Sequence, residues 1–315
     1  MKQTILGAGG SIGIELAKCL KDYTTDIRLV NRKPKQVNPT DTLFAADLTD
    51  RASVFSAIEG SAVTYVTIGF PYSVKMWRQS WVPFIQNVID ACVECDSKLV
   101  FFDNVYAIGG DHVRHITENS PIHPTSKKGH IRAEVDRRIL DSITKRGLKA
   151  IIARSPDFFG GTARDNSIAI NLIYNNLAKG KKAQWFCDAK RIHSMGYVPD
   201  LAKGTALLGN TPDAYNQIWN LPCDTQKITG EEWIRIFAEV MDAKNVYMIL
   251  PNWLVKSMGL FVPVLKEVAE MNYQYDRDYY FDSAKFNTYF NYTPTPNAAA
   301  VKRAVEQLQA SVARS

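Results

Sequence analysis

The stretch ILGAGGSIG, residues 5–13, decides the fold that we expect for this chain of 315 residues. Three of its glycines recur at every third position, behind a short apolar run and ahead of a helix predicted over residues 12–21. Gly7 permits a tight turn, Gly10 lets the backbone approach a pyrophosphate, and Gly13 allows the helix to pack closely on the strand. The amides of Ser11 and Ile12 at the helix start would then face phosphate oxygens. This order predicts a dinucleotide site; the alternative is a tight turn that binds nothing.

Short apolar runs alternate with amphipathic segments through the first half of the chain, which is the pattern of strands and crossover helices in a parallel sheet. The predicted strands contain TILGAG, DIRLVNR (followed by a loop), VTYVTIGF, KLVFFDN and KAIIARSPDFF, and AYNQIWNLP returns to the same sheet. They lack strict alternation, as strands covered on both faces do. We therefore predict an α/β fold with a doubly wound parallel Rossmann sheet, formed by residues 1–161 and 187–222. Residues 162–186 and 223–315 are predicted to form a smaller C-terminal α+β substrate-binding lobe.

The charge of the chain is modestly positive. Lysine and arginine number 38 against 32 aspartates and glutamates, which gives a net charge of +6. No long basic tract concentrates this excess, and the short patches 127–128 and 179–182 are interpreted as solvated turns. The modest positive charge suits anionic small molecules. We therefore expect a small-molecule substrate and no nucleic-acid partner. No apolar stretch approaches the roughly 20 residues that span a bilayer, so we also expect no membrane partner.

Five cysteines and the lack of a secretory leader favour a reducing, cytoplasmic location. Cys92 and Cys95 form a single CxxC pair in an apolar, helix-like segment, without a second pair or a neighbouring histidine. Zinc sites need such additional ligands. We interpret both residues as part of the core rather than as ligands or a redox pair, and we expect no metal site.

The end of the second predicted strand bears on which dinucleotide binds. NAD is usually held by a carboxylate on its ribose diol, whereas a 2′-phosphate is better accommodated by cations. Here Asn31 is followed by Arg32 and Lys33, which predicts NADP and leaves NAD as the alternative. The two cations could instead solvate a turn. Asp47 and Leu48 are placed to reach the adenine edge, although Asp47 could equally cap the next helix.

Motifs farther along the chain carry a family resemblance. AADLTD, DNVYAIGG, ARSPDFFGG and YVPDLAKGTALL follow the glycine loop in a specific order and spacing. In these motifs the chain resembles the extended short-chain dehydrogenase/reductase superfamily, in its NAD-dependent epimerase/dehydratase branch. The resemblance implies a Rossmann core, a C-terminal substrate lobe, a cleft between them, and a homodimer formed through two long helices.

The positions that carry this family's chemistry are changed here. The family uses a Ser or Thr after the fifth strand and a Tyr-x-x-x-Lys pair on the next helix, with the Tyr as acid/base. Aligned with that pattern, KKGHIRAEVD places Lys128 at the Tyr, Arg132 at the Lys and Asp136 at the Glu that follows. FFDNVY places Phe102 at the hydroxyl residue. The changes resemble an atypical subgroup in which Lys-Gly-x-x-Arg replaces the Tyr motif.

The replacements still predict a site. Lys128 and Arg132 lie four residues apart, so both side chains can point into the cleft. Arg132 can bind a cofactor ribose hydroxyl or a phosphate but never deprotonates, whereas Lys128 could donate a proton. Asn104 and Tyr106 follow the fifth strand at its carboxyl end, where ligands bind in such sheets. The candidate catalytic residues are therefore Lys128, Arg132, Tyr106 and Asn104. The alternatives are a solvated helix start for Lys128 and packing for Tyr106.

His193 bears on the substrate. Seven residues before Asp200, relatives that act on nucleotide sugars often carry an Arg that binds the diphosphate, and this chain has His193 there. A neutral His binds a diphosphate less well, so a nucleotide sugar is disfavoured; alternatively, His193 is a hydrogen-bonded loop residue.

Together these features predict an NAD(P)-dependent oxidoreductase or epimerase-like enzyme. It would act on a carbonyl or secondary alcohol of a small, sugar-like substrate. The alternative is a non-catalytic NADP(H)-binding redox sensor or regulatory protein, which the missing Ser, Tyr and Lys favour.

Overall fold

The computed structural model describes residues 1–259 and 261–312, which form two compact units. The first unit comprises residues 1–107, 128–155 and 201–221. The second comprises residues 108–127 and 156–200 together with the described residues from 222 onward. Each unit is described by itself below.

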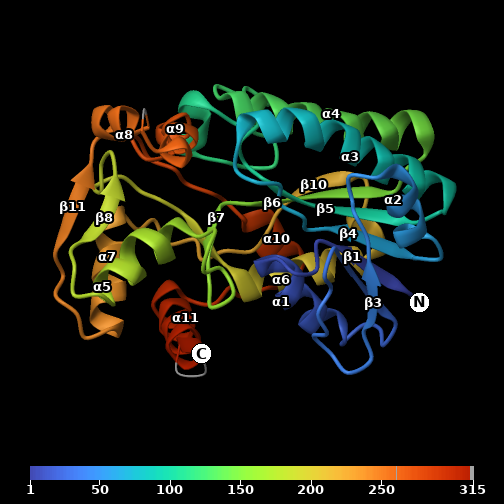
Figure 1. Ribbon diagram of the computed structural model, residues 1–315, viewed down its shortest axis with the longest axis horizontal. Coiled ribbons are helices and arrows are strands. Elements are labelled where there is room, and N and C mark those ends of the chain that lie inside the picture. The colour runs from blue at the N-terminus through green and yellow to red at the C-terminus, as the bar shows by residue number, and fades with distance from the viewer. Residues whose placement is uncertain (260, 313–315) are drawn as a thin grey trace. The chain divides into compact units, whose positions relative to one another are not determined.

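A seven-stranded parallel sheet forms the centre of the first unit (Figure 1). Its strand order is β10-β6-β5-β4-β1-β2-β3, so the chain winds outward in both directions from β1 and β4. This confirms the predicted doubly wound Rossmann sheet. The strands are β1 (Gln3–Leu6), β2 (Ile27–Asn31), β3 (Thr42–Ala45), β4 (Val63–Val66), β5 (Lys98–Asn104), β6 (Ala150–Ser155) and β10 (Gln217–Asn220).

Two of these strands test the sequence analysis at the sheet edges. Strand β10 pairs in parallel with β6, Gln217 lying opposite Ile151, so the predicted return of AYNQIWNLP to the sheet is confirmed. The prediction of only a loop after DIRLVNR was wrong, because β3 follows there and pairs with β2. None of the four side chains of β3 is fully buried. An edge strand of this kind lacks the apolar run by which a buried strand is recognised.

Helices cover both faces of the sheet (Figure 1). On one face, α2 (Arg51–Ile58), α3 (Val74–Glu94) and α4 (Lys127–Arg146) contribute to one apolar core with the strands. Trp81 and Phe84 of α3 and Val135 of α4 belong to this core. Cys92 of α3 is also fully buried within it, as predicted. On the other face lie α1 (Ser11–Leu20) and α6 (Val198–Gly209).

The second unit contains two short parallel strand pairs and its own aromatic core. Strand β7 (Asp157–Phe159) pairs with β9 (Met195–Tyr197), and β8 (Ala183–Phe186) pairs with β11 (Tyr247–Leu250). The edge of Phe159 packs on Trp233, with ring centroids 5.3 Å apart. The α-helices are α5 (Asn175–Leu177), α7 (Gly230–Val240), α8 (Asn252–Met258), α9 (Pro263–Ala269), α10 (Ala284–Tyr289) and α11 (Asn297–Val312). Single turns of 3₁₀ or π type occur in both units, at η1 (Gly110–Arg114), η2 (Ile170–Tyr174), η3 (Pro212–Ala214) and η4 (Asn272–Gln274).

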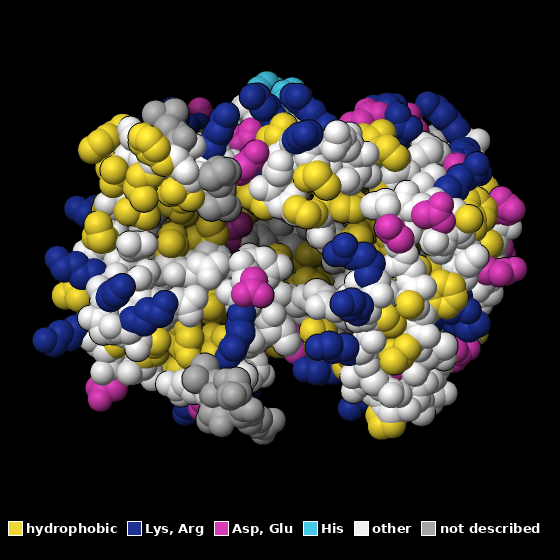
Figure 2. All heavy atoms as spheres, viewed as in Figure 1, with side chains coloured by type: hydrophobic (Ala, Val, Ile, Leu, Met, Phe, Trp, Pro, Cys, Tyr) yellow, Lys and Arg dark blue, Asp and Glu magenta, His cyan; other side chains and the backbone are white. Residues whose placement is uncertain are grey.

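The surface mixes charged, neutral and apolar side chains. On the face shown in Figure 2, Lys and Arg side chains are dispersed among acidic and neutral ones. Hydrophobic side chains gather over α8, where Trp253 is 69% exposed. No helix within residues 1–259 and 261–312 is long and apolar enough to cross a membrane.

A buried cluster of four ionisable side chains joins α4 to the central strands. Arg132 of α4 donates two hydrogen bonds to Asp103 of β5, one of them from Nε at 2.8 Å. Arg154 of β6 lies 3.2 Å from Asp136 of α4 and 3.9 Å from the second oxygen of Asp103. All four side chains are at most 3% exposed. Buried charges are costly unless paired, so this cluster fixes the position of α4 on the sheet.

Burial and the neighbouring Asp103 carboxylate raise the pKa of Asp136 to about 8. In the unfolded chain the same carboxyl has a pKa of about 3.9. Between these two values the folded protein binds more protons than the unfolded chain. The contribution of Asp136 to stability is therefore fully present below about pH 4 and is lost as the pH rises through about 8.

We predict that Asp136→Asn flattens this pH dependence. The free energy of unfolding of the wild type should decline between about pH 5 and pH 8 more steeply than that of the variant. Urea unfolding across this range measures the difference. Glu134→Gln, which removes a half-buried carboxylate from the same helix, is the control and should keep the wild-type slope. Equal slopes for Asp136→Asn and wild type would contradict the prediction.

Candidate active site

A groove of about 390 Å³ lies in the first unit at the carboxyl ends of β1 to β4. It is lined by the glycine loop after β1, by the end of β2, by residues 46–49 after β3 and by residues 67–71 after β4. Two residues of α3, Met76 and Ser80, complete the wall. The predicted cofactor residues that the structure brings together along this groove are Gly7, Gly10, Asn31, Arg32, Asp47 and Leu48. Ser11, Ile12 and Gly13 form the first turn of α1 and are buried.

The three glycines differ in why the fold needs them. Gly7 has a φ of +97°, and a Cβ there would lie 2.5 Å from the amide nitrogen of Ile68. A Cβ on Gly13 would lie 2.6 Å from the carbonyl oxygen of Gly7, so both positions are closed to other residues by the protein itself. A Cβ on Gly10 would make only ordinary contacts, the nearest at 3.5 Å. Packing within the described chain therefore does not explain Gly10, whereas close approach of a ligand does.

The start of α1 also fits a phosphate. Gly10 is the N-cap of this helix, and no side chain caps the amides there. Amides at a helix start carry partial positive charge and bind anions. Together with the glycines, this feature fits the pyrophosphate of a dinucleotide.

The far end of the groove places opposite charges close together. The Asp47 carboxylate accepts hydrogen bonds from the amide and hydroxyl of Thr49, which lower the pKa of Asp47, and the nearby Arg32 lowers it further. Asp50, not Asp47, caps α2, because its side chain accepts from the amide of Ser53 at 2.8 Å. The alternative that Asp47 caps the next helix was therefore wrong. Asp47 lies in the groove as a carboxylate.

A second group of side chains lies beyond the groove, at the carboxyl ends of β4 and β5. The Lys128 ammonium lies 4.4 Å from the ring centroid of Tyr72. The hydroxyls of Tyr72 and Tyr106 are 3.3 Å apart, within hydrogen-bond distance. The Tyr106 ring stacks on Trp77 of α3, with centroids 6.1 Å apart. The side-chain oxygen of Asn104 accepts from the Tyr106 amide at 2.9 Å, which holds the turn after β5.

Lys128 is 0% exposed, so the alternative of a solvated helix start was wrong. The sequence does not show this, because the aromatic ring that covers Lys128 belongs to a loop more than fifty residues earlier in the chain. Tyr106 does pack, as one alternative held, but its hydroxyl also reaches Tyr72. The sequence analysis missed Tyr72 altogether. The available signal was that Tyr72 directly follows residues 67–71, which come after β4 and line the groove.

Arg132 lies one turn after Lys128 on α4 and is 2% exposed. Its Nε and one Nη bond to Asp103, and the guanidinium lies 4.2 Å from the ring centroid of Trp81. The predicted contact of Arg132 with a cofactor ribose would have to come from its remaining nitrogen, Nη1. Phe102, which stands in place of the family's hydroxyl residue, lies half-buried in β5.

His193 lies in the second unit and is 2% exposed. Its Nε2 is 3.0 Å from Asp157 and its Nδ1 is 3.2 Å from the carbonyl oxygen of Gln274. The imidazole is stacked between the rings of Tyr275 and Tyr279, at 4.4 and 4.6 Å. Tyr275 also donates to Asp157 at 2.5 Å. The alternative of a hydrogen-bonded residue is confirmed.

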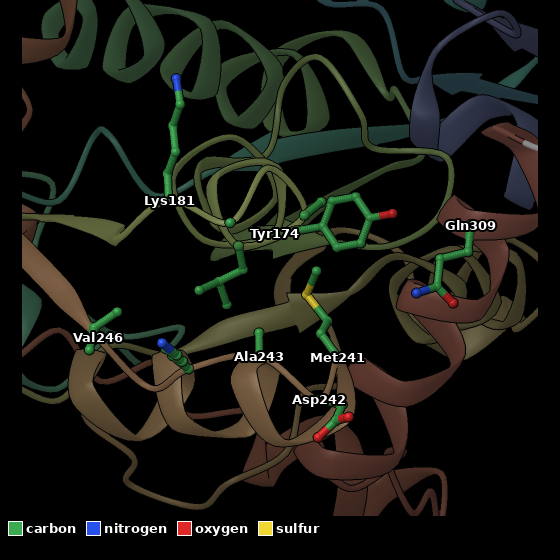
Figure 3. Close-up of a pocket in the computed structure, with 11 residues that line it drawn as sticks. Tyr174, Lys181, Met241, Asp242, Ala243, Val246 and Gln309 are labelled. Atoms are coloured by element: carbon green, nitrogen blue, oxygen red, sulfur yellow. The ribbon is translucent and has the colours of Figure 1, made fainter.

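A separate hollow of about 780 Å³ lies in the second unit and is a weaker candidate for an active site (Figure 3). Its wall includes the apolar side chains of Met241, Ala243 and Val246. Lys181 and Asp242 extend in opposite directions, so they form no acid/base pair in this hollow. We therefore place the candidate active site in the first unit.

A parallel sheet wound in both directions, with a glycine-lined groove at its carboxyl edge, defines a nucleotide-binding protein of the Rossmann class. The chain belongs to the NAD dependent epimerase/dehydratase family, whose sequence model matches residues 4–222. Among curated proteins, none matches the sequence.

Solved structures of similar fold include two epimerases and a dehydratase. UDP-glucose 4-epimerase of Thermus thermophilus, in complex with NAD, aligns with a TM-score of 0.79 at 16% identity, over 98% of this chain and 99% of that one. A double mutant of dTDP-glucose 4,6-dehydratase from Streptomyces venezuelae aligns with a TM-score of 0.80 at 16% identity, over 98% and 97%. UDP-glucuronic acid 4-epimerase from Bacillus cereus gives 0.78 at 15%, over 98% and 97%. At these identities the likeness shows the fold alone.

The glycine geometry generates a prediction that separates binding from folding. Gly10→Ala should leave the melting temperature unchanged, because its Cβ meets no close neighbour. It should raise the Kd for NADPH at least about tenfold, equivalent to about 1.4 kcal/mol, because the Cβ occupies space needed by the pyrophosphate. Gly13→Ala is the matched comparison and should lower the melting temperature, because its Cβ meets backbone. Calorimetry measures both quantities; unchanged NADPH binding by folded Gly10→Ala would contradict the assignment.

Proposed function

We propose that the protein is an NADP(H)-dependent oxidoreductase that reduces a carbonyl, or oxidises the corresponding secondary alcohol, on a small, sugar-like substrate. The observation that carries the proposal is the buried Lys128 beneath Tyr72, next to the hydroxyl of Tyr106. A buried cation beside paired phenols is a costly arrangement that a packing role alone does not require. It lies at the carboxyl edge of the sheet, where such folds bind ligands.

The groove residues fit a nicotinamide dinucleotide. The glycine loop and the start of α1 would hold the pyrophosphate, and Asn31, Arg32, Asp47 and Leu48 would hold the adenosine end. The similar epimerase structures from Thermus thermophilus and Bacillus cereus are complexes with NAD. When bound, the cofactor supplies or accepts a hydride.

The residues beyond the groove would serve the substrate. Lys128, through its charge, or Tyr106, through its hydroxyl, is proposed to serve the substrate oxygen, where negative charge develops during reduction. Asn104 holds the turn that presents Tyr106. Arg132 is proposed to contact the cofactor ribose through Nη1 while Asp103 holds its other edge.

The substrate class follows from charge. The similar structures include a complex with UDP-glucose and a UDP-glucuronic acid 4-epimerase, which supports a sugar-like substrate. At the position where the resembled relatives carry an arginine, this chain has His193 hydrogen-bonded to the carboxylate of Asp157. His193 lacks the permanent charge of that arginine, so we propose a substrate without a diphosphate.

The proposal is tested by NADPH oxidation with 4-nitrobenzaldehyde, glyceraldehyde and 9,10-phenanthrenequinone as probes. We predict that Lys128→Met lowers kcat/KM for the reduced probe by about 100-fold or more, because the charge that stabilises the developing oxyanion is lost. Lys127→Met removes the exposed neighbouring lysine of α4 and should leave the rate unchanged. Tight NADPH binding with no oxidation by any probe would instead favour a redox sensor.

Cofactor selectivity gives a separate prediction. Arg32→Ser should raise the Kd for NADPH about 10-fold or more, because a charge-assisted contact to the 2′-phosphate is lost. The Kd for NADH, which has no such phosphate, should change little. Lys33→Ser is the control for a general loss of charge, since Lys33 does not line the groove. If Arg32→Ser weakens NADPH and NADH equally, Arg32 does not read the 2′-phosphate.

A further inference from the structure

We propose that Tyr72 is the catalytic residue that transfers the proton to or from the substrate oxygen, with Tyr106 as its hydrogen-bond partner. The inference rests on the proposed oxidoreductase function and deepens it, because it assigns the role that no residue at the family's usual positions fills. Neither the glycine loop nor the aligned helix α4 points to Tyr72. Its assignment comes from its position and contacts.

The position of Tyr72 follows from the order of the strands. The groove runs from the end of β2, past β1, to the end of β4, where residues 67–71 form its wall. Tyr72 is the next residue of that segment. Trp77, which packs edge-on against Tyr72 at 5.8 Å, lies between the two α3 residues that line the groove, Met76 and Ser80. A ligand extended along the groove from its adenosine end would therefore reach Tyr72 with its other end.

Exposure separates Tyr72 from Lys128. The Lys128 side chain is fully buried beneath the Tyr72 ring, so it acts on a bound substrate through that ring. Tyr72 is half-buried and retains a surface that a substrate can contact. Its hydroxyl carries a transferable proton, which Asn104 and the neighbouring Trp77 do not supply. Tyr106 is also half-buried, and Trp77 packs on both phenol rings; Tyr72 is assigned as the donor because its ring lies on the Lys128 ammonium, with Tyr106 as its partner.

The contacts of Tyr72 suit it to release and regain a proton. A positive charge on the face of an aromatic ring stabilises negative charge that develops on the ring and its oxygen. The Lys128 ammonium is placed in this way, at 4.4 Å from the centroid. Either hydroxyl can donate in the contact between Tyr72 and Tyr106; when Tyr106 donates, this hydrogen bond favours the Tyr72 phenolate as well.

When bound, the reduced nicotinamide would supply a hydride, which is one proton and two electrons, to the carbonyl carbon, and the carbon–oxygen π bond would break. The oxygen takes the electron pair of that bond and accepts the proton of the Tyr72 hydroxyl, so an alcohol and the oxidised cofactor result. The Tyr72 phenolate then regains a proton from Tyr106, which is reprotonated from water. Oxidation of the alcohol runs through the same steps in reverse.

The test is Tyr72→Phe, which keeps the ring over Lys128 and removes only the hydroxyl. With the probe that the wild type reduces fastest, kcat should fall by about 100-fold or more, as expected for loss of a general acid. The KM for NADPH should stay within about threefold of wild type, because the groove is untouched. Tyr106→Phe should reduce kcat less than Tyr72→Phe does. Tyr23→Phe, an exposed tyrosine of the first unit, is the control and should have no effect.

The outcomes separate this inference from the proposed function. If the wild type reduces a probe and Tyr72→Phe retains its kcat, the assignment of Tyr72 is overturned while the oxidoreductase function stands. If Tyr106→Phe loses more kcat than Tyr72→Phe, Tyr106 is the donor and the assignment is again overturned. If the wild type reduces none of the probes, the function fails and the role of Tyr72 fails with it. Near-UV circular dichroism checks that each variant keeps the packing of its aromatic rings.

Discussion

The buried ion pair between Asp103 and Arg132 is the interaction on which the candidate site depends. It ties the carboxyl end of β5 to the first turns of α4, and Arg154 and Asp136 extend it. Removing one partner from such a pair leaves an uncompensated buried charge, at a cost of about 3–5 kcal/mol. Because Lys128 lies one helical turn before Arg132, the pair also sets where Lys128 enters the structure. The ammonium is thereby held under Tyr72 rather than in solvent.

In our account this arrangement lets the chain keep the family's fold with other residues at the positions that the sequence analysis aligned with the usual catalytic ones. Arg132 stands where the resembled family has a lysine, but here it joins α4 to the sheet. Lys128 stands where that family has a tyrosine, and it brings a positive charge to the site instead of a hydroxyl group. In our account the phenols come instead from the segments after β4 and β5, as Tyr72 and Tyr106. We therefore propose that proton transfer takes place from the loops at this edge of the sheet rather than from the helix.

Local patterns in the sequence were sufficient for much of the fold. The glycine loop fixed the first strand–turn–helix unit, and the apolar runs located the buried strands, including β10 at the opposite edge from β3. Strand β3 was not predicted, because an edge strand with no fully buried side chain has no apolar pattern. The need for Gly7 and Gly13 was also predictable, since a Cβ at either position would meet backbone, whereas the role of Gly10 stays a prediction.

The candidate site was less predictable because its contacts join distant parts of the chain. Lys128 meets Tyr72 and Arg132 meets Asp103 only after β4, β5 and α4 have packed together. No periodicity in the sequence predicts such pairs. The sequence analysis therefore left a solvated position as an alternative for Lys128, and it missed Tyr72. Asp47 shows the same limit on a smaller scale, because the choice between Asp47 and Asp50 as the helix cap depends on a single hydrogen bond.

The central claim is that this site performs a hydride transfer although the family's usual catalytic residues are replaced. It is tested most directly by following deuterium from the C4 position of labelled NADPH into a carbonyl probe by mass spectrometry, with the unmodified protein. The account predicts that deuterium appears on the carbinol carbon of the product, from one face of the nicotinamide only. Retention of all the label in tightly bound cofactor, with every probe unchanged, would contradict it.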